Sequence, residues 1–282
     1  MDAKDFFRPW EHTAKNWVEC IEKIGSIQTL AGARRKIAWR GVIDASWALH
    51  SSVFRKFMDR NGVPPDEGDV VKYEQELLKA ARREWRFDDL SALETFAQIQ
   101  HFGGPTRLLD VSFSPLVALW FAVEQKFDNA GWLKPDLDGR LFIFDATNNF
   151  VDLDSDWGGR PLPWSSKPPD SWRQGLPKVW RPPSYNERIS AQNSAFLIGG
   201  VPLVRSGGNA KYRKAPGNGT GAGTWSMDEV RRSTSVVLSM NSLDRAPQVG
   251  ATPTYTLRIE AGGKPEIREM LETHYGFNAS SI

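Results

Sequence analysis

The sequence predicts an α+β fold, with a helical N-terminal half packed on a mostly antiparallel sheet. Apolar residues recur at helical spacing through most of the first half, whereas short continuous apolar runs, typical of buried strands, gather in the second half. Helices followed by strands favour an α+β domain over alternating βαβ units. A chain of 282 residues with 40% hydrophobic content is long enough to bury one sizeable core.

The expected helices lie mainly in the first half. Residues 1–30 are expected to form an amphipathic lead-in helix, from the spacing of Trp17, Ile21 and Ile24. Others are expected over Ser46–Asp59, Asp69–Arg86 and Leu90–Gln100. Ser114-Pro115 predicts a further helix start, because serine caps free amides and proline suits the first helical position. A last helix begins at Lys264 and fades near Tyr275.

Strands are expected at Lys36–Ile43, Arg140–Asp145, Ala195–Ile198, Thr234–Met240 and Thr254–Ile259. Between them, residues 146–183 are rich in proline, tryptophan and aspartate and predict an irregular surface loop, and residues 206–223 form a Gly-rich loop. We therefore divide the chain into a lead-in at 1–35 and one functional domain at 36–282.

Composition limits the function. A net charge of +2 creates no global field that would recruit nucleic acid or an anionic membrane. The single cysteine, Cys20, cannot form an internal disulfide and is expected to be inert packing. The N-terminus is charged and lacks a signal-peptide apolar stretch, and no apolar run reaches the length of a membrane span. We expect a cytoplasmic protein with no membrane partner and no metal.

Trp39-Arg40-Gly41 places an arginine at the exit of an expected strand. A guanidinium suits a diphosphate or carboxylate, which it can bind with two hydrogen bonds. The glycine allows another backbone or a ligand to come close. For an isolated Arg-Gly, a surface ion pair is the commoner explanation.

The block Gln100–Phe121 is richer in polar residues and is expected to be a loop that feeds the helix after Ser114. Free amides at such a helix start attract anions. Structural roles compete with this function: Arg107 and Asp110 could form an ion pair that holds the loop, His101 could cap helix carbonyls, and Ser114 is expected to cap the helix.

These motifs resemble the FRG-domain family, named for Phe-Arg-Gly, with Trp39 in the Phe position. The similar stretches are Gln-His-aromatic-Gly-x-Pro-Thr-Arg-Leu-Leu-Asp at 100–110 and Ser-Pro-Leu-x-Ala-Leu-x-Phe-Ala at 114–122. The segments Asn186–Phe196 and His274–Ile282 are also similar to the family. The resemblance thus spans about Lys36 to Ile282. Because the family pattern continues past Ile282, a longer natural chain is possible.

The FRG pattern is in turn distantly similar to ADP-ribosyltransferases, which implies an ADP-ribosyltransferase-like fold with a split sheet and NAD as substrate. The resemblance implies that Arg40 grips NAD. Further NAD contacts are implied for Gly41, Thr106, Arg107, Ser112, Ser114 and Phe121. Where the catalytic glutamate is expected the chain has Gln192, and the nearest acid is Glu187. A neutral glutamine cannot act as a base, and Glu187 could supply that role in its place. The implied catalytic residues are therefore Arg40, Gln192 and Glu187.

Three functions stay open. The first is an NAD-dependent ADP-ribosyltransferase-like toxin or effector that modifies RNA or protein, in a toxin–antitoxin or phage-defence setting with an antitoxin as possible partner. The second is a non-catalytic nucleotide- or partner-binding module of a defence system. The third is a nuclease or other hydrolase that uses His101 and Asp110. Lys211–Lys214 could contact the acceptor's backbone, although a solvated charged loop is the commoner explanation of such a run. The tryptophans at 157, 164, 172 and 180 could stack bases or could clamp the loop to the domain.

Overall fold

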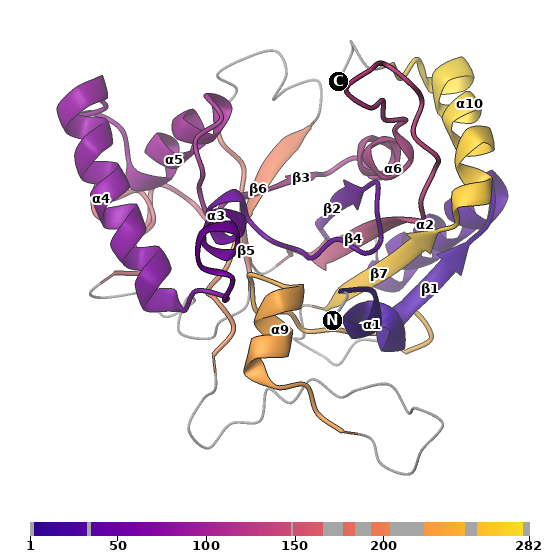
Figure 1. Cartoon of the computed structure of the whole chain (residues 1–282), viewed down its shortest axis with the longest axis horizontal. Coiled ribbons are helices and arrows are strands. Elements are labelled where there is room, and N and C mark those ends of the chain that lie inside the picture. The colour runs from indigo at the N-terminus through magenta and orange to yellow at the C-terminus, as the bar shows by residue number, and fades with distance from the viewer. Residues whose placement is uncertain are drawn as a thin grey trace.

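The computed structural model describes residues 3–32, 35–147, 149–165, 177–183, 193–203, 223–245 and 253–278. Within them the chain is an α+β domain built on a mixed seven-stranded sheet in the order β1-β7-β4-β2-β3-β6-β5 (Figure 1). The strands are β1 (Glu11–Ala14), β2 (Ile37–Val42), β3 (Leu109–Ser112), β4 (Gly139–Asp145), β5 (Lys178–Trp180), β6 (Ser194–Ile198) and β7 (Thr254–Ile259). β1 and β7 pair in parallel, and the other neighbours are antiparallel.

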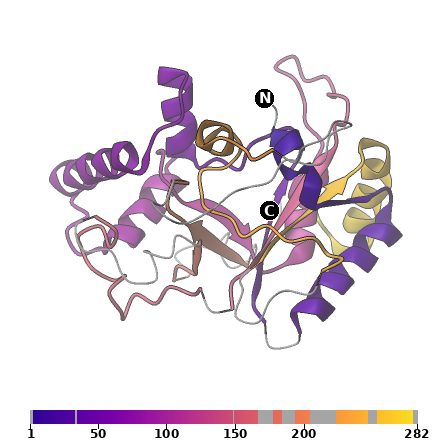
Figure 2. The same cartoon turned by 90° about the horizontal axis from the view of Figure 1, so that it is seen from below.

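Helices cover both faces of the sheet. The described helices are α1 (Ala3–Phe7), α2 (Trp17–Ala31), α3 (Ser52–Asn61), α4 (Glu67–Trp85), α5 (Ala92–His101), α6 (Pro115–Val123), α9 (Met227–Ser233) and α10 (Lys264–Tyr275), with short 3₁₀ turns at Arg8–Trp10 and Ala261–Gly263. α2, α6 and α10 pack on one face of β2, β4 and β7. α1 and α9 contribute to the core on the opposite face. α4 and α5 form a third core with β5 and β6, at the other end of the molecule from α2 and α10 (Figure 2).

The sheet is nearly divided between β2 and β3. β2 pairs with β4 over six residues, from Ile37 to Val42, but with β3 only through Trp39 opposite Ser112. The two strands then diverge, and α6 and α5 stand on either side of the opening (Figure 1). This junction positions the site described below.

Most predicted elements are present, with shifted ends. α4 starts at a capping box made by Asp66 and Asp69, and α6 starts where Ser114 accepts a hydrogen bond from the amide of Val117. The strands at β2, β4, β6 and β7 and the final helix α10 are confirmed. Residues 46–51 are not helical, and α3 begins only at Ser52.

Several predictions were wrong. The lead-in helix is confirmed over α2, which carries Trp17, Ile21 and Ile24, but the preceding residues were wrongly included in it. They contain the strand β1, whose sequence Glu-His-Thr-Ala lacks an apolar pattern and which pairs with β7 at the edge of the described sheet. With β2 and β3, the N-terminal half thus supplies three strands. Leu109–Ser112 is a strand rather than a loop. Thr234–Met240 is not a strand, because its two ends form only isolated bridges with Leu49 and Thr254.

The segment 146–183 is not a simple surface loop. It contributes β5, and Trp157, Trp164 and Trp180 are each at most 6% exposed in the core with α4 and α5. These rings are therefore packing residues and not surfaces for stacking bases. Trp172, the Gly-rich loop at 206–223 (apart from its last residue, Gly223) and Lys211–Lys214 lie outside the described residues. Cys20 is buried as predicted, and burial raises the pKa of its thiol to about 12.

Candidate functional site

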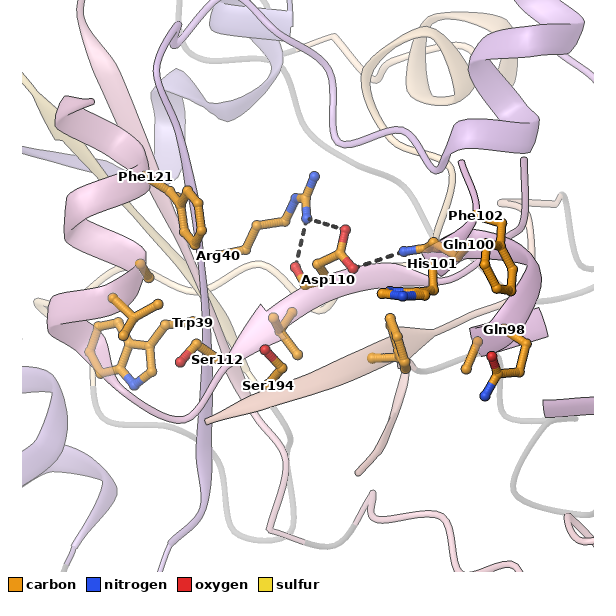
Figure 3. A pocket seen from close by; sticks show the side chains of 16 residues that line it. Trp39, Arg40, Gln98, Gln100, His101, Phe102, Asp110, Ser112, Phe121 and Ser194 are labelled. Atoms are coloured by element: carbon orange, nitrogen blue, oxygen red, sulfur yellow. Dashed lines mark hydrogen bonds and ion pairs between the residues drawn. The ribbon is translucent and has the colours of Figure 1, made fainter. Parts of the chain in front are cut away.

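A pocket of about 600 Å³ lies between α5 and α6, over the junction of β2 and β3 (Figure 3). Its volume is in the range of small-ligand sites. α5 and the residue after it supply Ala97, Gln98, Gln100, His101 and Phe102; α6 supplies Val117, Ala118 and Phe121; the strands supply Trp39, Arg40, Gly41, Asp110, Val111, Ser112, Ser194 and Phe196. Both motifs singled out in the sequence therefore meet at one cavity.

Arg40 fills the gap where β2 and β3 diverge. Its Nη1 donates to the backbone carbonyl of Asp110 at 2.6 Å and lies 3.9 Å from the Oδ2 atom of the same residue. The Arg40 side chain is 20% exposed, whereas that of Asp110 is 70% exposed. Burial lowers the pKa of Arg40 and the carboxylate of Asp110 opposes this change, but an arginine stays protonated at neutral pH. The pocket thus holds a cation and a carboxylate side by side.

A relay of hydrogen bonds orients the Asp110 carboxylate. Gln100 Nε2 donates to Asp110 Oδ1 at 2.8 Å, as Figure 3 shows. The Gln100 Oε1 atom accepts from the hydroxyl of Thr106, which is fully buried. Since the Thr106 hydroxyl also accepts from the amide of Leu108, its single proton is directed to Gln100. Thr106 is therefore a buried support of the pocket wall rather than a residue that lines it.

Arg107 does not contact Asp110, so the predicted ion pair between them is wrong. Its guanidinium is buried on the far side of the wall and forms hydrogen bonds with both carboxylate oxygens of Glu74 and with one of Glu67. Burial alone would lower the pKa of Arg107, but the two carboxylates outweigh it and raise that pKa above its usual value. Arg107 and Asp110 do not meet because Arg107 precedes β3, which begins at Leu109, whereas Asp110 lies within that strand.

The remaining implied residues divide into two groups. Ser112 and Phe121 line the pocket, and the Ser112 hydroxyl accepts from the amide of Ser114 at 3.0 Å. Ser114 caps α6 and does not line the pocket. Glu187 and Gln192 lie outside the described residues. The sequence motifs did not indicate that Ala97 and Gln98 line the pocket. Ser194 and Phe196 lie in the segment Asn186–Phe196 that resembles the family, and Phe196 also lies in the predicted strand at 195–198, but neither was singled out as a site residue.

Gly41 has a packing role that the structure makes explicit. A Cβ at this position would lie 1.8 Å from the carbonyl oxygen of Ala118 and 2.7 Å from the amide of Ala122, both in the backbone of α6. Only glycine therefore allows α6 to approach β2 so closely. This approach brings Phe121 to the cavity (Figure 3).

A smaller pocket of about 180 Å³ adjoins the first and shares Arg40, Gln100 and Asp110 with it. His50 and Arg55 line this second pocket. His50 is 8% exposed, and its Nε2 atom lies 2.8 Å from the carbonyl oxygen of Arg231. Burial lowers the pKa of His50 to about 4, although the bond to Arg231 opposes this shift. His50 is therefore neutral at physiological pH, and its Nε2–H donates to that carbonyl.

This shift predicts a loss of stability in acid. Because the unfolded chain binds a proton at His50 near pH 6.5 and the folded chain does so only near pH 4, the free energy of unfolding should fall as the pH drops between these values. The expected slope from this residue is about 1.4 kcal/mol per pH unit. Urea unfolding of the wild type and of His50→Gln at several pH values measures it. Equal slopes in the two proteins would contradict the assignment.

Among the described residues, no group of histidine, cysteine, aspartate and glutamate side chains is placed to hold a metal ion. None of the described helices combines the length and apolar character that a membrane crossing requires.

Comparison with known proteins places the site in a family. Residues 35–131 match the model of the FRG domain, and this segment contains every lining residue of the main pocket except Ser194 and Phe196. The resemblance expected as far as Ile282 is thus supported over 35–131. No curated protein and no solved structure matches the chain. The segment 35–131, which carries Arg40, Asp110 and most of the lining of the α5–α6 pocket, is thus an FRG domain.

Proposed function

We propose that the α5–α6 pocket binds NAD and that the protein is an ADP-ribosyltransferase-like enzyme that transfers ADP-ribose to a macromolecule. The observation that carries this proposal is the arginine held beside a carboxylate inside an otherwise partly aromatic cavity. A guanidinium is suited to the diphosphate of NAD, and Phe102 or Phe121 offers a flat apolar surface to a ring of the dinucleotide. The hydroxyls of Ser112 and Ser194 are suited to a ribose.

The transfer needs a carboxylate, and Asp110 is our candidate. When the bond between ribose C1′ and nicotinamide breaks, its electron pair leaves with the nicotinamide and positive charge develops on the ribose. A carboxylate close to C1′ stabilises that charge. The acceptor then forms a new bond to C1′ and gives up a proton, which the carboxylate can take. Asp110 is exposed to the pocket and oriented by Gln100, so it can serve both steps.

Labelled NAD provides the test. We expect the wild type to release nicotinamide and to transfer label to a polymer in a cell lysate. Arg40→Ala should weaken NAD binding at least about tenfold, since it removes a charge-assisted contact. Asp110→Asn preserves shape and the bond from Gln100, and should retain NAD binding while the rate of nicotinamide release falls by about 10²-fold or more.

The controls separate binding from folding. Arg83→Ala removes an exposed arginine that pairs with its neighbour Glu84, and it should leave both NAD binding and turnover unchanged. Retained NAD turnover in Arg40→Ala would refute the proposal. NAD binding with no nicotinamide release in the wild type would favour the binding-module function instead.

The cellular role is part of the same proposal. As a toxin or effector of a toxin–antitoxin or phage-defence system, the wild type should arrest growth when it is expressed without a partner. Arg40→Ala should relieve that arrest. A growth defect that persists in both Arg40→Ala and Asp110→Asn would separate toxicity from the proposed chemistry.

One observation favours a hydrolase as the second candidate. His101 and Asp110 line the same pocket, in the arrangement of Figure 3. A histidine and a carboxylate can act as acid and base in hydrolysis. Cleavage of purified RNA in the absence of NAD, lost in His101→Gln, would support that function over transfer.

A further inference from the structure

A third pocket, of about 500 Å³, carries a cluster of cations and aromatic rings. Its lining residues include the cations Arg35, Lys36 and Arg181 and the rings of Trp39, Phe113 and Phe150. Three of them are cationic and none is acidic. Arg35 is neutralised by an ion pair with the buried Asp145, whereas no carboxylate among the described residues pairs with Lys36 or Arg181. The pocket therefore presents a surplus of positive charge.

The two cations lie against two flat rings. Phe113 and Phe150 are nearly parallel, with ring centroids 5.6 Å apart and planes at 16°. The Lys36 ammonium lies 4.5 Å from the centroid of the Phe150 ring, and the Arg181 guanidinium lies 5.5 Å from that of Phe113. Arg181 is further held by a hydrogen bond to the Asn193 side chain. Charge and aromatic surface are thus arranged together rather than scattered.

This pocket is adjacent to the proposed NAD pocket along three strands. Trp39 lines both. Ser112, the last residue of β3, lines the main pocket, and Phe113, the residue after the strand, lines the third pocket. At β6, Ser194 lines the main pocket and Asn193 the third. A ligand held at Phe113 and Arg181 is therefore placed next to the main cavity.

We infer that the third pocket binds single-stranded nucleic acid and presents it as the acceptor to the α5–α6 pocket. Cations that track the phosphates, combined with rings on which bases stack, are how proteins hold single strands without reading their sequence. A cavity of small-ligand size takes an unpaired nucleotide rather than a double helix. The acceptor role rests on the proposed function, whereas the binding itself does not.

Fluorescence anisotropy with a labelled single-stranded RNA of about 12 nucleotides tests the binding. The variant Lys36→Ala/Arg181→Ala should bind this RNA about tenfold more weakly. Two lost phosphate contacts should also reduce the slope of log K against log salt by about 1.4. Phe150→Leu keeps apolar volume but removes a ring, and it should weaken binding without changing the salt slope.

The matched control is Lys56→Ala/Arg83→Ala. Like the test variant, it removes one lysine and one arginine. Lys56 also lies over an aromatic ring, 5.3 Å from the centroid of Tyr73, but neither Lys56 nor Arg83 lines the third pocket. Equal weakening in the control and the test variant would overturn the inference, as would tighter binding of duplex than of single-stranded RNA. If single-stranded DNA binds with the same affinity as the RNA, the inference is supported, and the contacts are to phosphates and bases and not to the ribose 2′-hydroxyl.

Separate NAD titrations keep the two proposals distinguishable. RNA binding that survives in Arg40→Ala and depends on Lys36 and Arg181 supports this inference even if NAD does not bind. Competition between NAD and RNA for the wild type would assign the third pocket to the NAD site and overturn it. Label transfer to protein alone, with no RNA binding, would overturn it as well.

Discussion

Replacing Arg107 with alanine is expected to lower the free energy of unfolding by about 3–5 kcal/mol. The Arg107 side chain is 3% exposed, and that of its partner Glu74 is completely buried. Glu74 also accepts a hydrogen bond from the indole of Trp164 at 2.9 Å, and the Arg107 guanidinium lies 4.6 Å from the centroid of that ring. Without Arg107, the Glu74 carboxylate remains buried with no cation to compensate its charge.

Urea unfolding followed by fluorescence measures this effect. Arg83→Ala is the control, because its exposed pair with Glu84 should contribute no more than about 1 kcal/mol. If Arg107→Ala instead keeps its stability and loses NAD binding, the residue is a ligand contact, as the family resemblance implied. We expect any loss of binding in this variant to follow the loss of folded protein.

The local signals in the sequence predicted elements well because they depend on neighbours along the chain. The Ser114-Pro115 start relies on groups within three residues, and α6 begins where this pattern places it. The capping box of α4 at Asp66 and Asp69 is equally local, although the helix was expected to begin only at Asp69. The strand β1 could not be predicted in this way. Its residues Glu11–Ala14 are stabilised by pairing with β7, which lies more than two hundred residues later in the chain.

The site was predicted in part, for a similar reason. Arg40 and Ser112 were recognised from the motifs, and both line the pocket. The partners of Arg107 could not be predicted, because Glu74 lies in α4 and the whole of α5 separates it from Arg107 along the chain. No sequence spacing links the two residues. Asp110 was assigned to Arg107 because the two are close in sequence. Recognising β3 corrects this, because Arg107 precedes the strand and Asp110 lies within it, beside Arg40.

Gly41→Ala is expected to lower the free energy of unfolding by about 3 kcal/mol, near the upper end for an overpacked core. The added methyl would overlap the carbonyl oxygen of Ala118, and this atom belongs to the backbone of α6, which cannot rotate away as a side chain can. The clash should push α6 off β2 and widen the α5–α6 pocket. NAD affinity is therefore expected to fall together with stability.

The matched control is the same substitution at Gly25, within α2, where an added Cβ meets nothing within 4 Å. Gly25→Ala should raise the free energy of unfolding by about 0.5–1 kcal/mol, because alanine favours a helix over glycine. If Gly41→Ala lowers the free energy of unfolding and Gly25→Ala raises it, Gly41 is needed for the packing of α6 on β2. Unchanged stability with lost NAD binding in Gly41→Ala would mean instead that the glycine makes room for the ligand itself, and that α6 can yield without cost.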